Sequence, residues 1–522
     1  MLLLEQMQAS CDLLLQIINN RFYLYLSHSV KLYLLIHTLL HLKPVQVFYQ
    51  VKYRLKKPAY VALEAPTDGF KIQISGSKTE PIPKYKCLKG EKFSFLNLEH
   101  EFAGWNFTEN GMLWAYNQNY FDWISQENYP KEDGYKWIDK FIEELPDNKV
   151  GLDPYPIALR SINWVKFFCR YPDAATKPRL DSLYSQIKLL EKKLEYHLLG
   201  NHLLEDAYAL YIGASFFNDQ PLLQRAKKLL LSQLDEQVLK DGAHYEQSPM
   251  YHCILLDRLL DCINIKSDSK LVDYAERMMG HLESIKWGVG SLPLLNDSAN
   301  GIAPSTSQLF YYAKGLGLKW KKTPMKECGY RKMMAGNMEA IVDVGNITAT
   351  YQPGHTHADT FNYELHIDGK PFVVDTGIST YNKTERRQLE RSTIAHNCVS
   401  PEEKNSSEVW GGFRVGKRCH TEITEDTENV IEAVHNGFGK KCCRKFEMKD
   451  GSFSVEDWFD GEAVSYIHLA KDADEKLVKV EGALSIETKP WKYSTEYNRF
   501  IEGKVIEIRF KGHCRYTIQL RK

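Results

Sequence analysis

The chain has 522 residues, of which 43% are hydrophobic and 26% are charged, as in ordinary soluble globular proteins of two or three domains. Lysine plus arginine equals aspartate plus glutamate at 67 each, which excludes a protein whose bulk charge attracts nucleic acid or another polyanion. An acidic ligand would therefore need a local site.

The 11 cysteines are an odd number without a C-x-x-C pair, and only Cys442 and Cys443 are adjacent. In a chain of this length, such a pattern predicts reduced and mostly buried thiols instead of a disulfide framework.

Residues 1–95 predict an N-terminal extension, a helical start followed by a Pro/Lys-rich connector. The opening "MLLLEQMQASC" has no basic region before its apolar run, so no classical signal peptide is predicted. The apolar stretch "VKLYLLIHTLLHLKPVQVFY" is too short and too polar to span a bilayer. Its polar members are Lys31, His37, His41 and Lys43. It predicts an amphipathic helix on the main body, with a peripheral membrane contact as the alternative.

Residues 96–332 predict a domain of helical hairpins. Leucine and isoleucine recur at helical spacing from Leu183 to Leu194, in a helix that we expect to end at Gly200. Further helical segments follow at 203–217, 221–242 and 248–265, the last with Ser248 as its cap and Pro249 at its first position. Repeated helix pairs predict a solenoid or a closed toroid.

Residues 333–522 predict an antiparallel β-sheet domain. In "FNYELHI" the apolar side chains alternate, Asp368-Gly369 predicts a tight turn, and "KPFVVDTG" returns as a second strand. Further strands are expected in "NVIEAVHNGFG", "SFSVEDWFDG", "EGALSIET" and "KVIEIRF". These patterns predict a β-sandwich or stacked sheets.

Two histidines lie just before this hairpin, and Asp375 lies on its returning strand. His357, Asp375 and His396 are two imidazoles and one carboxylate, a set that suits zinc, with manganese or calcium as alternatives. A structural metal is expected more than a catalytic one. Because the spacing is long and irregular, ordinary polar residues at strand ends remain the alternative.

Two other polar clusters lie at element boundaries, where sites usually form. Asn201 and His202 lie between two helices, although Asn201 could also act as a helix cap. Glu246 and Tyr251 lie in a loop and the following helix start, although Tyr251 could also be a core residue. His355 could likewise bond only a backbone carbonyl.

Six segments, in order over residues 95 to 400, together resemble the heparinase II/III-like family of bacterial polysaccharide lyases. They are "WAYNQNYFDW", "DPYPIALRSINWVKF", "GNHLLEDAYAL", "YEQSPMYH", "GHTHADTFNYELHIDGKPFVVDTG" and "ERRQLERSTIAHNCV". The first 90 residues match no chemistry of that family.

The resemblance implies an α/α toroid followed by an antiparallel β-sheet domain, with an active cleft between them. It also implies β-elimination at a uronic acid unit. Asn201 and His202 would face the uronate carboxylate, and Tyr251 would be the main acid/base group. His355 would be its partner from the β domain, Tyr381 would occupy a second tyrosine position, and the three residues named above would hold the metal. Substrate binding is assigned to Tyr116, Asn117, Arg160, Asn163, Trp164, Glu246, Arg387 and Arg391.

These residue types suit that reaction. Donors that bind the carboxylate stabilise the enolate-like charge that develops when the C5 proton leaves. An unperturbed tyrosine has a pKa of about 10, so Tyr251 would need nearby positive charge, from Arg387 or Arg391, to act as a phenolate. His355 titrates nearer neutrality and is the alternative base.

Two other functions remain compatible with the sequence: a non-catalytic glycan-binding relative, and a metal-dependent glycan hydrolase that uses the metal directly. The expected partner is an acidic polysaccharide, of glycosaminoglycan or alginate-like type, and not nucleic acid. The zero net charge favours a less charged glycan over a highly sulfated one. The resemblance implies the periplasm or cell envelope, whereas the lack of a signal peptide favours the cytoplasm.

Overall fold

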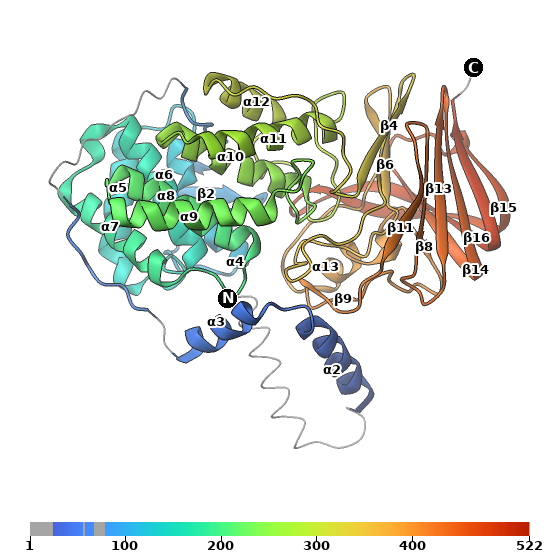
Figure 1. Cartoon of the computed structure of the whole chain (residues 1–522), viewed down its shortest axis with the longest axis horizontal. Helices are drawn as coiled ribbons and strands as arrows, with labels where there is room; N and C mark the ends of the chain where they lie inside the picture. Colours follow the sequence, from blue (N-terminus) through green and yellow to red (C-terminus); the bar gives the residue numbers. More distant parts are fainter. Residues whose placement is uncertain (1–24, 56–57, 67–78, 521–522) are drawn as a thin grey trace.

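The computed structural model describes residues 25–55, 58–66 and 79–520. Helices make up one half of the main body and a curled antiparallel sheet makes up the other (Figure 1). This arrangement confirms the predicted fold class of a helical domain followed by a β-sheet domain. Among the described residues, no helix is both long and apolar enough to cross a bilayer.

The helical half is built from antiparallel neighbours that bury a shared aromatic and aliphatic core. Its helices are α4 (Met112–Tyr120), α5 (Lys131–Glu144), α6 (Pro154–Arg170), α7 (Lys177–Lys192), α8 (Gly200–Phe216), α9 (Gln220–Gln237), α10 (Pro249–Ile265), α11 (Ser269–Ile285) and α12 (Thr306–Gly315). α10 begins as predicted, because the Ser248 hydroxyl accepts a hydrogen bond from the Tyr251 N–H and Pro249 occupies the first position.

One predicted helix boundary is wrong. α7 ends at Lys192 and not at Gly200, which instead begins α8 with a positive φ of 59°. A small antiparallel sheet of β1 (Leu88–Lys89), β2 (Lys92–Phe95) and β3 (Leu98–Glu101) packs Phe93 against the helical core. This sheet crosses the predicted boundary between residues 95 and 96.

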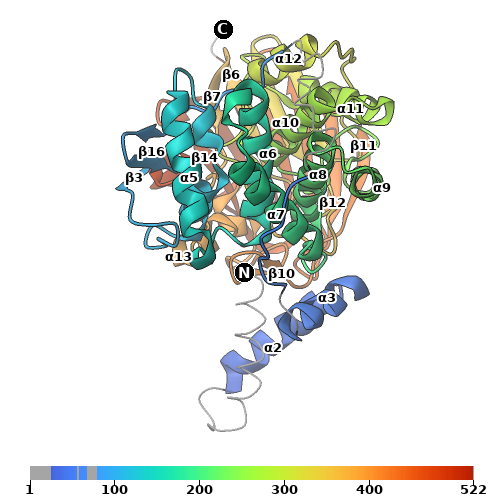
Figure 2. The ribbon, with the colours of Figure 1, turned by 90° about the vertical axis from the view of Figure 1, so that its left-hand side faces the viewer.

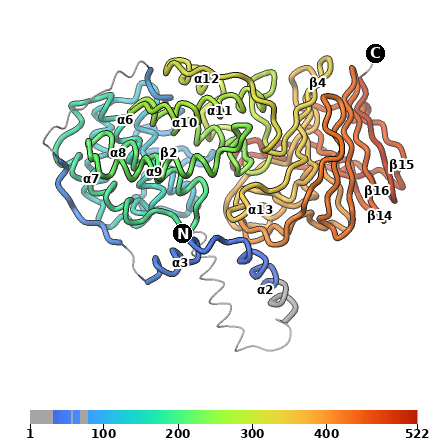
Figure 3. The backbone as a smooth tube through the Cα atoms, in the orientation of Figure 1, coloured from blue at the N-terminus to red at the C-terminus, as the bar shows by residue number. Residues whose placement is uncertain are grey.

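The β domain is one 11-stranded hydrogen-bonded sheet instead of two separate layers. Its main path runs β11-β12-β13-β14-β7-β6-β5-β4, while β16 pairs with β14 and β15, and β8 pairs with β14. The strong curl in Figure 3 gives the sheet a concave side. The strands are β4 (Tyr330–Ala335), β5 (Met338–Asp343), β6 (Tyr363–Ile367), β7 (Lys370–Val373), β8 (Val399–Ser400), β11 (Thr421–Asp426), β12 (Val430–His435), β13 (Cys442–Lys449), β14 (Ser452–Leu469), β15 (Val478–Glu496) and β16 (Arg499–Gln519).

Loops between these strands carry the short helix α13 (Glu385–Glu390) and a two-stranded ribbon of β9 (Val409–Trp410) and β10 (Arg414–Val415). All ten cysteines of the described residues are free, and eight of them are buried, as predicted. Asp375 lies two residues beyond the end of β7, so it belongs to a loop and not to the returning strand as expected.

The predicted single N-terminal helix is two helices, α2 (Tyr25–Leu39) and α3 (Pro44–Leu55). The break falls at Pro44, which begins α3 because its ring prevents continuation of a preceding helix. Both helices contact the main body, yet they project from it on one side, as Figure 2 shows from a second direction.

Candidate active site

Side chains from both halves of the molecule line one cavity of about 400 Å³. Asn201 comes from the first turn of α8, Tyr251 from the first turn of α10, and His355 from the loop before β6. At Gly200, a Cβ would lie 2.5 Å from Glu246 Oε1, so only glycine lets the Asn201 N–H donate to that oxygen at 2.8 Å. The local backbone therefore brings Asn201 and Glu246 together.

Asn201 and His355 meet at one end of this cavity. The Asn201 amide donates to both Glu246 carboxylate oxygens, at 3.2 and 2.9 Å, and its Nδ2 lies 3.3 Å from His355 Nε2. Glu246 does not line the cavity and is 1% exposed, so its predicted contact with substrate is replaced by a role in orienting Asn201. One N–H of Asn201 thus faces the imidazole edge.

His355 is held between a tyrosine and a carboxylate. Its ring stacks on the Tyr251 ring at a centroid distance of 3.9 Å, and its Nδ1 lies 2.9 Å from Asp297 Oδ2. Because a carboxylate only accepts hydrogen bonds, this contact assigns the proton to Nδ1. His355 Nε2, the nitrogen nearest Asn201, lies farther from a carboxylate, 3.4 Å from Glu246 Oε2, and carries the lone pair in the neutral tautomer protonated on Nδ1.

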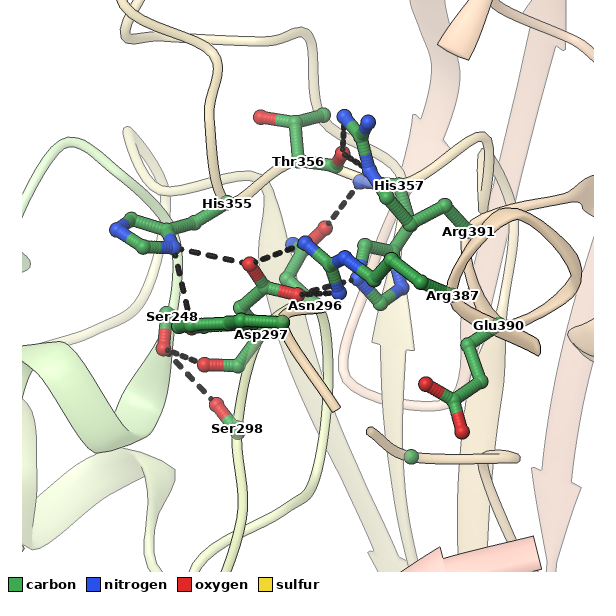
Figure 4. A network of polar contacts seen from close by, with 12 residues as sticks. Ser248, Asn296, Asp297, Ser298, His355, Thr356, His357, Arg387, Glu390 and Arg391 are labelled. Atoms are coloured by element: carbon green, nitrogen blue, oxygen red, sulfur yellow. Dashed lines mark hydrogen bonds and ion pairs between the residues drawn. The ribbon is translucent and has the colours of Figure 1, made fainter. Parts of the chain in front are cut away.

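Asp297 is a functional residue that the sequence did not reveal. Its two oxygens accept from both terminal nitrogens of Arg387, at 2.5 and 2.7 Å, and from His357 Nε2 at 2.8 Å, besides His355 (Figure 4). Burial alone raises the pKa of Asp297, but Arg387 and the two histidines hold that pKa well below its usual range. Asp297 is therefore a buried anion that orients His355.

Two tyrosine hydroxyls lie beside His355. The Tyr251 and Tyr381 hydroxyls are 3.4 Å apart, and the Tyr381 hydroxyl is also 3.4 Å from His355 Nδ1. Burial is the largest influence on both phenols, and it raises the pKa of each, which disfavours the phenolate. Arg387 acts in the opposite direction on each pKa. Tyr251 is thus a neutral phenol at neutral pH, and the positive charge expected to activate it is neutralised by Asp297.

Further lining residues of the cavity come from the helical domain. His202 lines it with its Nδ1 3.0 Å from Glu195 Oε2, and its ring packs 4.7 Å from the Tyr155 ring. Tyr116 and Asn117 line the same cavity, as their assignment to substrate binding requires. Their roles toward a substrate remain predictions.

Three residues assigned to substrate binding from α6 do not reach this cavity. Arg160 is fully buried and donates to Gln186 and to two backbone carbonyls, and Trp164 packs against Phe121 and Phe141 in the core. Asn163 donates to the Tyr120 carbonyl and lines an adjoining cavity, which shares Lys84, Asp122, Arg258 and Ile302 with the first. α6 turns Arg160 and Trp164 into the helical core, whereas the assignment of Asn163 to substrate binding stays a prediction.

The two arginines of α13 and its C-terminal cap are also buried away from the cavity. Arg387 is committed to Asp297, and Arg391 donates to the Thr356 carbonyl at 2.7 Å. Neither side chain lines the cavity. Both instead position the loop that carries His355 and His357.

The predicted metal ligands lie together beneath this loop. His396 Nδ1 is 2.8 Å from Asp375 Oδ2, and the His357 and His396 rings are 5.2 Å apart. His357 uses Nε2 for Asp297, so His357 Nδ1 and His396 Nε2 remain buried without a hydrogen-bond partner. These two free imidazole nitrogens suit a metal, but the ligand atoms of His357, Asp375 and His396 do not all lie within 4.8 Å of one another.

The pKa values of the two imidazoles are shifted in opposite directions. Burial lowers the pKa of His357 to about 4, which leaves it neutral, whereas Asp375 overcomes burial and raises the pKa of His396. A metal binds the neutral form of histidine, so the raised pKa of His396 makes metal binding compete with protonation of this residue.

Another group, Asp241, His281 and Cys328, has one ligand atom from each residue within 4.8 Å of the others. The Asp241 carboxylate already accepts hydrogen bonds from the backbone N–H groups of Ala243, Lys326 and Cys328. These bonds explain its position in the turn without a metal.

Comparison with known proteins places this chain in a family. Residues 175–301 match the heparinase II/III N-terminus, and residues 318–514 match the heparinase II/III-like C-terminal domain. The heparin-sulfate lyase of Pedobacter heparinus is 26% identical over 429 residues, which cover 70% of this chain and 63% of that protein. This chain therefore aligns with less than two thirds of that relative.

Solved structures share the fold. A heparinase III superposes with a TM-score of 0.58 at 13% identity, over 91% of this chain and 90% of the other. A mutant of the heparan sulfate lyase HepC from Pedobacter heparinus superposes with a TM-score of 0.54 at 15% identity, over 92% and 88%. With both domains matched in sequence, and the toroid and β-sheet arrangement shared, this chain belongs to the heparinase II/III-like family.

Proposed function

We propose that the protein is a polysaccharide lyase that cleaves a uronic-acid-containing polysaccharide by β-elimination in the cavity between its two domains. The observation that carries this proposal is the meeting of Asn201, Tyr251 and His355 in one cavity, from three separate parts of the chain. The relative named a heparin-sulfate lyase supports an acidic polysaccharide as the substrate class.

The cavity's charge favours a sparsely sulfated substrate. Of the three lysines and arginines that line the cavity, Lys84 pairs with Asp122 at 2.7 Å and Arg258 pairs with Asp257 at 2.8 Å, and the third is Lys383. Because these pairs neutralise much of the positive charge, little remains to hold many sulfate groups. A uronate carboxylate, in contrast, needs only a few convergent donors.

In the proposed mechanism, the uronate carboxylate takes the Asn201 N–H that faces His355 in the free protein. His355 Nε2 removes the C5 proton, and the electrons of that bond move onto the uronate carboxylate as an enolate-like charge that the Asn201 N–H stabilises. These electrons then form the C4=C5 double bond as the C4–O4 bond breaks, and the Tyr251 phenol protonates the leaving O4 oxygen. Asp297 stabilises the imidazolium that forms, as a buried acceptor on Nδ1.

The raised pKa of Tyr251 supports this division of roles, because a phenol that stays protonated is suited to donate and not to abstract. After the product leaves, His355 Nε2 gives its proton to solvent and the Tyr251 phenolate takes one from solvent, which returns both groups to their starting states. Net transfer is one proton from C5 to O4, with no external reagent.

The first test replaces Tyr251 with phenylalanine and measures the ultraviolet absorbance of the unsaturated product on a panel of uronate polysaccharides. We expect the wild type to form this chromophore and Tyr251→Phe to lose roughly 10²–10⁴-fold in kcat. Tyr311→Phe, at a side chain 77% exposed outside this cavity, is the matched control and should leave kcat unchanged.

New reducing ends without the chromophore would show hydrolysis and contradict elimination. A kcat/KM that rises about tenfold per pH unit above neutrality would instead assign Tyr251 as a phenolate base. Wild-type rates in Tyr251→Phe would remove this residue from the mechanism.

We also propose that a divalent metal, zinc first, is held by His357, Asp375 and His396 in a structural role. When bound, it would supply fixed positive charge that ties the loop before β6 to the loop after β7. We expect a chelator to lower the melting temperature of metal-loaded protein and to leave one metal less per chain by elemental analysis. His396→Gln should abolish that shift, whereas His420→Gln, at an exposed histidine, should keep it. The site would be contradicted if elemental analysis found no metal in the purified protein and the chelator left its melting curve unchanged.

A further inference from the structure

The helices α2 and α3 carry an unusual share of the exposed apolar surface. Of the 18 exposed large hydrophobic side chains in the described residues, nine lie between residues 32 and 55. Figures 1 and 2 show both helices projecting on one side of the main body. An exposed apolar patch of this kind marks a surface for a partner or a membrane.

The exposed apolar residues recur at helical spacing. In α2 they are Leu32, Tyr33, Ile36 and Leu39, followed by Leu40 in the turn. In α3 they are Val47, Phe48, Val51 and Leu55. Residues separated by three, four or seven positions lie on one side of a helix, so each helix presents one continuous apolar side to the solvent. We call these nine residues the α2–α3 apolar face.

The burial of α3 is the reverse of an ordinary surface helix, which buries its apolar side. Here Gln46 and Gln50 are buried at 3% and 2% exposure, while Phe48 is 62% exposed. Gln46 Nε2 donates to the backbone carbonyls of Leu198 and Tyr351, at 3.2 and 3.3 Å. The polar side is therefore bonded to the protein, and the apolar side is left outside.

Specific contacts hold both helices in this orientation. The Tyr53 hydroxyl donates to the Leu194 carbonyl at 2.7 Å, and Lys43 pairs with Glu236. On α2, the Thr38 hydroxyl accepts from Trp410 Nε1 at 3.1 Å. Because these bonds come from the opposite side of each helix, turning the apolar side inward would break them.

The charges of residues 25–55 indicate which kind of partner binds the α2–α3 apolar face. Residues 25–55 contain no aspartate or glutamate, and their basic side chains include Lys31, Lys52 and Arg54, all exposed. Apolar residues combined with basic ones and no acidic ones fit the interface of an anionic bilayer. No helix of the described residues is long and apolar enough to cross a bilayer, so these described helices would lie in the membrane plane.

We propose that the α2–α3 apolar face docks the protein on an anionic phospholipid surface. The contacts of the two helices give this docking a direction relative to the cavity. Gln46 of α3 bonds the carbonyl of Leu198, which lines the cavity, and Thr38 of α2 contacts the β9–β10 ribbon that carries the cavity residue Phe413. Docking thus places one rim of the cavity beside the lipid headgroups, within reach of glycans attached to that surface.

The experiment is flotation of the purified full chain with vesicles of phosphatidylcholine alone or of phosphatidylcholine mixed with phosphatidylglycerol. We expect binding to the mixed vesicles, weakened by high salt, and little binding to phosphatidylcholine alone. Phe48→Ser/Val51→Ser/Leu55→Ser should bind mixed vesicles at least roughly ten-fold more weakly. Its control, Val289→Ser/Met334→Ser/Ile486→Ser, removes equally exposed apolar side chains elsewhere and should bind like wild type.

Two charge-reversal variants test whether electrostatic attraction contributes to the vesicle binding. Lys31→Glu/Lys52→Glu should lose roughly ten-fold in binding, whereas Lys471→Glu/Lys511→Glu, at exposed lysines of the β domain, should not. All four variants should keep the wild-type melting temperature because the altered side chains are exposed. Failure of the full chain to float with mixed vesicles would overturn the proposal. So would a dimer in light scattering that only the Phe48→Ser/Val51→Ser/Leu55→Ser variant dissociates, because a second copy would then be the occupant.

Discussion

At the scale of single residues, Asp297 joins the proposed catalytic histidine to a buried arginine. It accepts from His355 and His357 and from both terminal nitrogens of Arg387, with no exposure to solvent. Removing one partner of a buried ion pair leaves the other charge uncompensated, which typically costs more than the pair contributes. Asp297 thus couples the geometry of His355 to the stability of the domain junction.

Asp297→Asn should lower the unfolding free energy by about 3–5 kcal/mol, because Arg387 stays buried without its counter-charge. It should also reduce kcat, because an asparagine no longer stabilises the imidazolium of His355. Denaturant unfolding and the product absorbance assay measure the two effects separately.

The double variant Asp297→Asn/Arg387→Met is the control for this prediction. It removes the buried charge, so it should recover part of the stability but none of the activity. Recovery of wild-type kcat in the double variant would show that Asp297 does not act on His355.

Residue identities were predictable where a motif lay in one short segment. Tyr251 and His355 each stand in such a segment, and both line the cavity. Asp297 was missed because its partners lie 58 to 90 residues away along the chain. Arg387 was assigned to substrate because an arginine near a motif suggests anion binding, and its internal partner is visible only in three dimensions.

At the scale of elements, the sequence predicted those with clear periodicity. α8, α9 and α10 were located within a few residues, and so were β6, β7 and β12. β5 is buried along its whole length, so its burial follows no alternation. The end of α7 was misplaced because apolar residues continue through the non-helical turn at 193–199.

One turn makes an element-level prediction. Gly377, with a φ of 66°, follows the metal ligand candidate Asp375, and a Cβ there would collide with the carbonyl oxygen of Ser494. Gly377→Ala should therefore lower the unfolding free energy by roughly 2–4 kcal/mol, as thermal or denaturant unfolding would measure.

Gly90→Ala separates the collision from backbone strain. Gly90 has a similar φ of 62° but no atom near its would-be Cβ, so this change should cost only about 1 kcal/mol. Equal losses in the two variants would show that packing against Ser494 contributes nothing.

At the scale of the whole molecule, buried neutral histidines predict sensitivity to acid. Burial lowers the pKa of His252 and of His435 to about 3, one in each domain, whereas an unfolded histidine has a pKa of about 6.5. A depressed folded-state pKa means that the stabilising contribution is full above about pH 6.5 and is lost as the pH falls toward 3.

The melting temperature should therefore fall between about pH 7 and pH 5, with each such histidine contributing roughly 1.4 kcal/mol per pH unit below its unfolded pKa. His435→Gln should weaken this pH dependence, since glutamine does not titrate. The exposed His420→Gln should follow the wild-type curve, and a parallel curve for His435→Gln would refute the assignment.

The position of β16 has a consequence for synthesis of the chain. β16 comes after every other described strand, yet it lies between β14 and β15 and pairs with both along most of its length. Until residues 499–519 leave the ribosome, two long strands have unmatched edges, which are sites of aggregation for nascent proteins. The helical domain can thus finish folding during translation, whereas the β domain must wait, and a chain shortened before β16 should accumulate as insoluble protein.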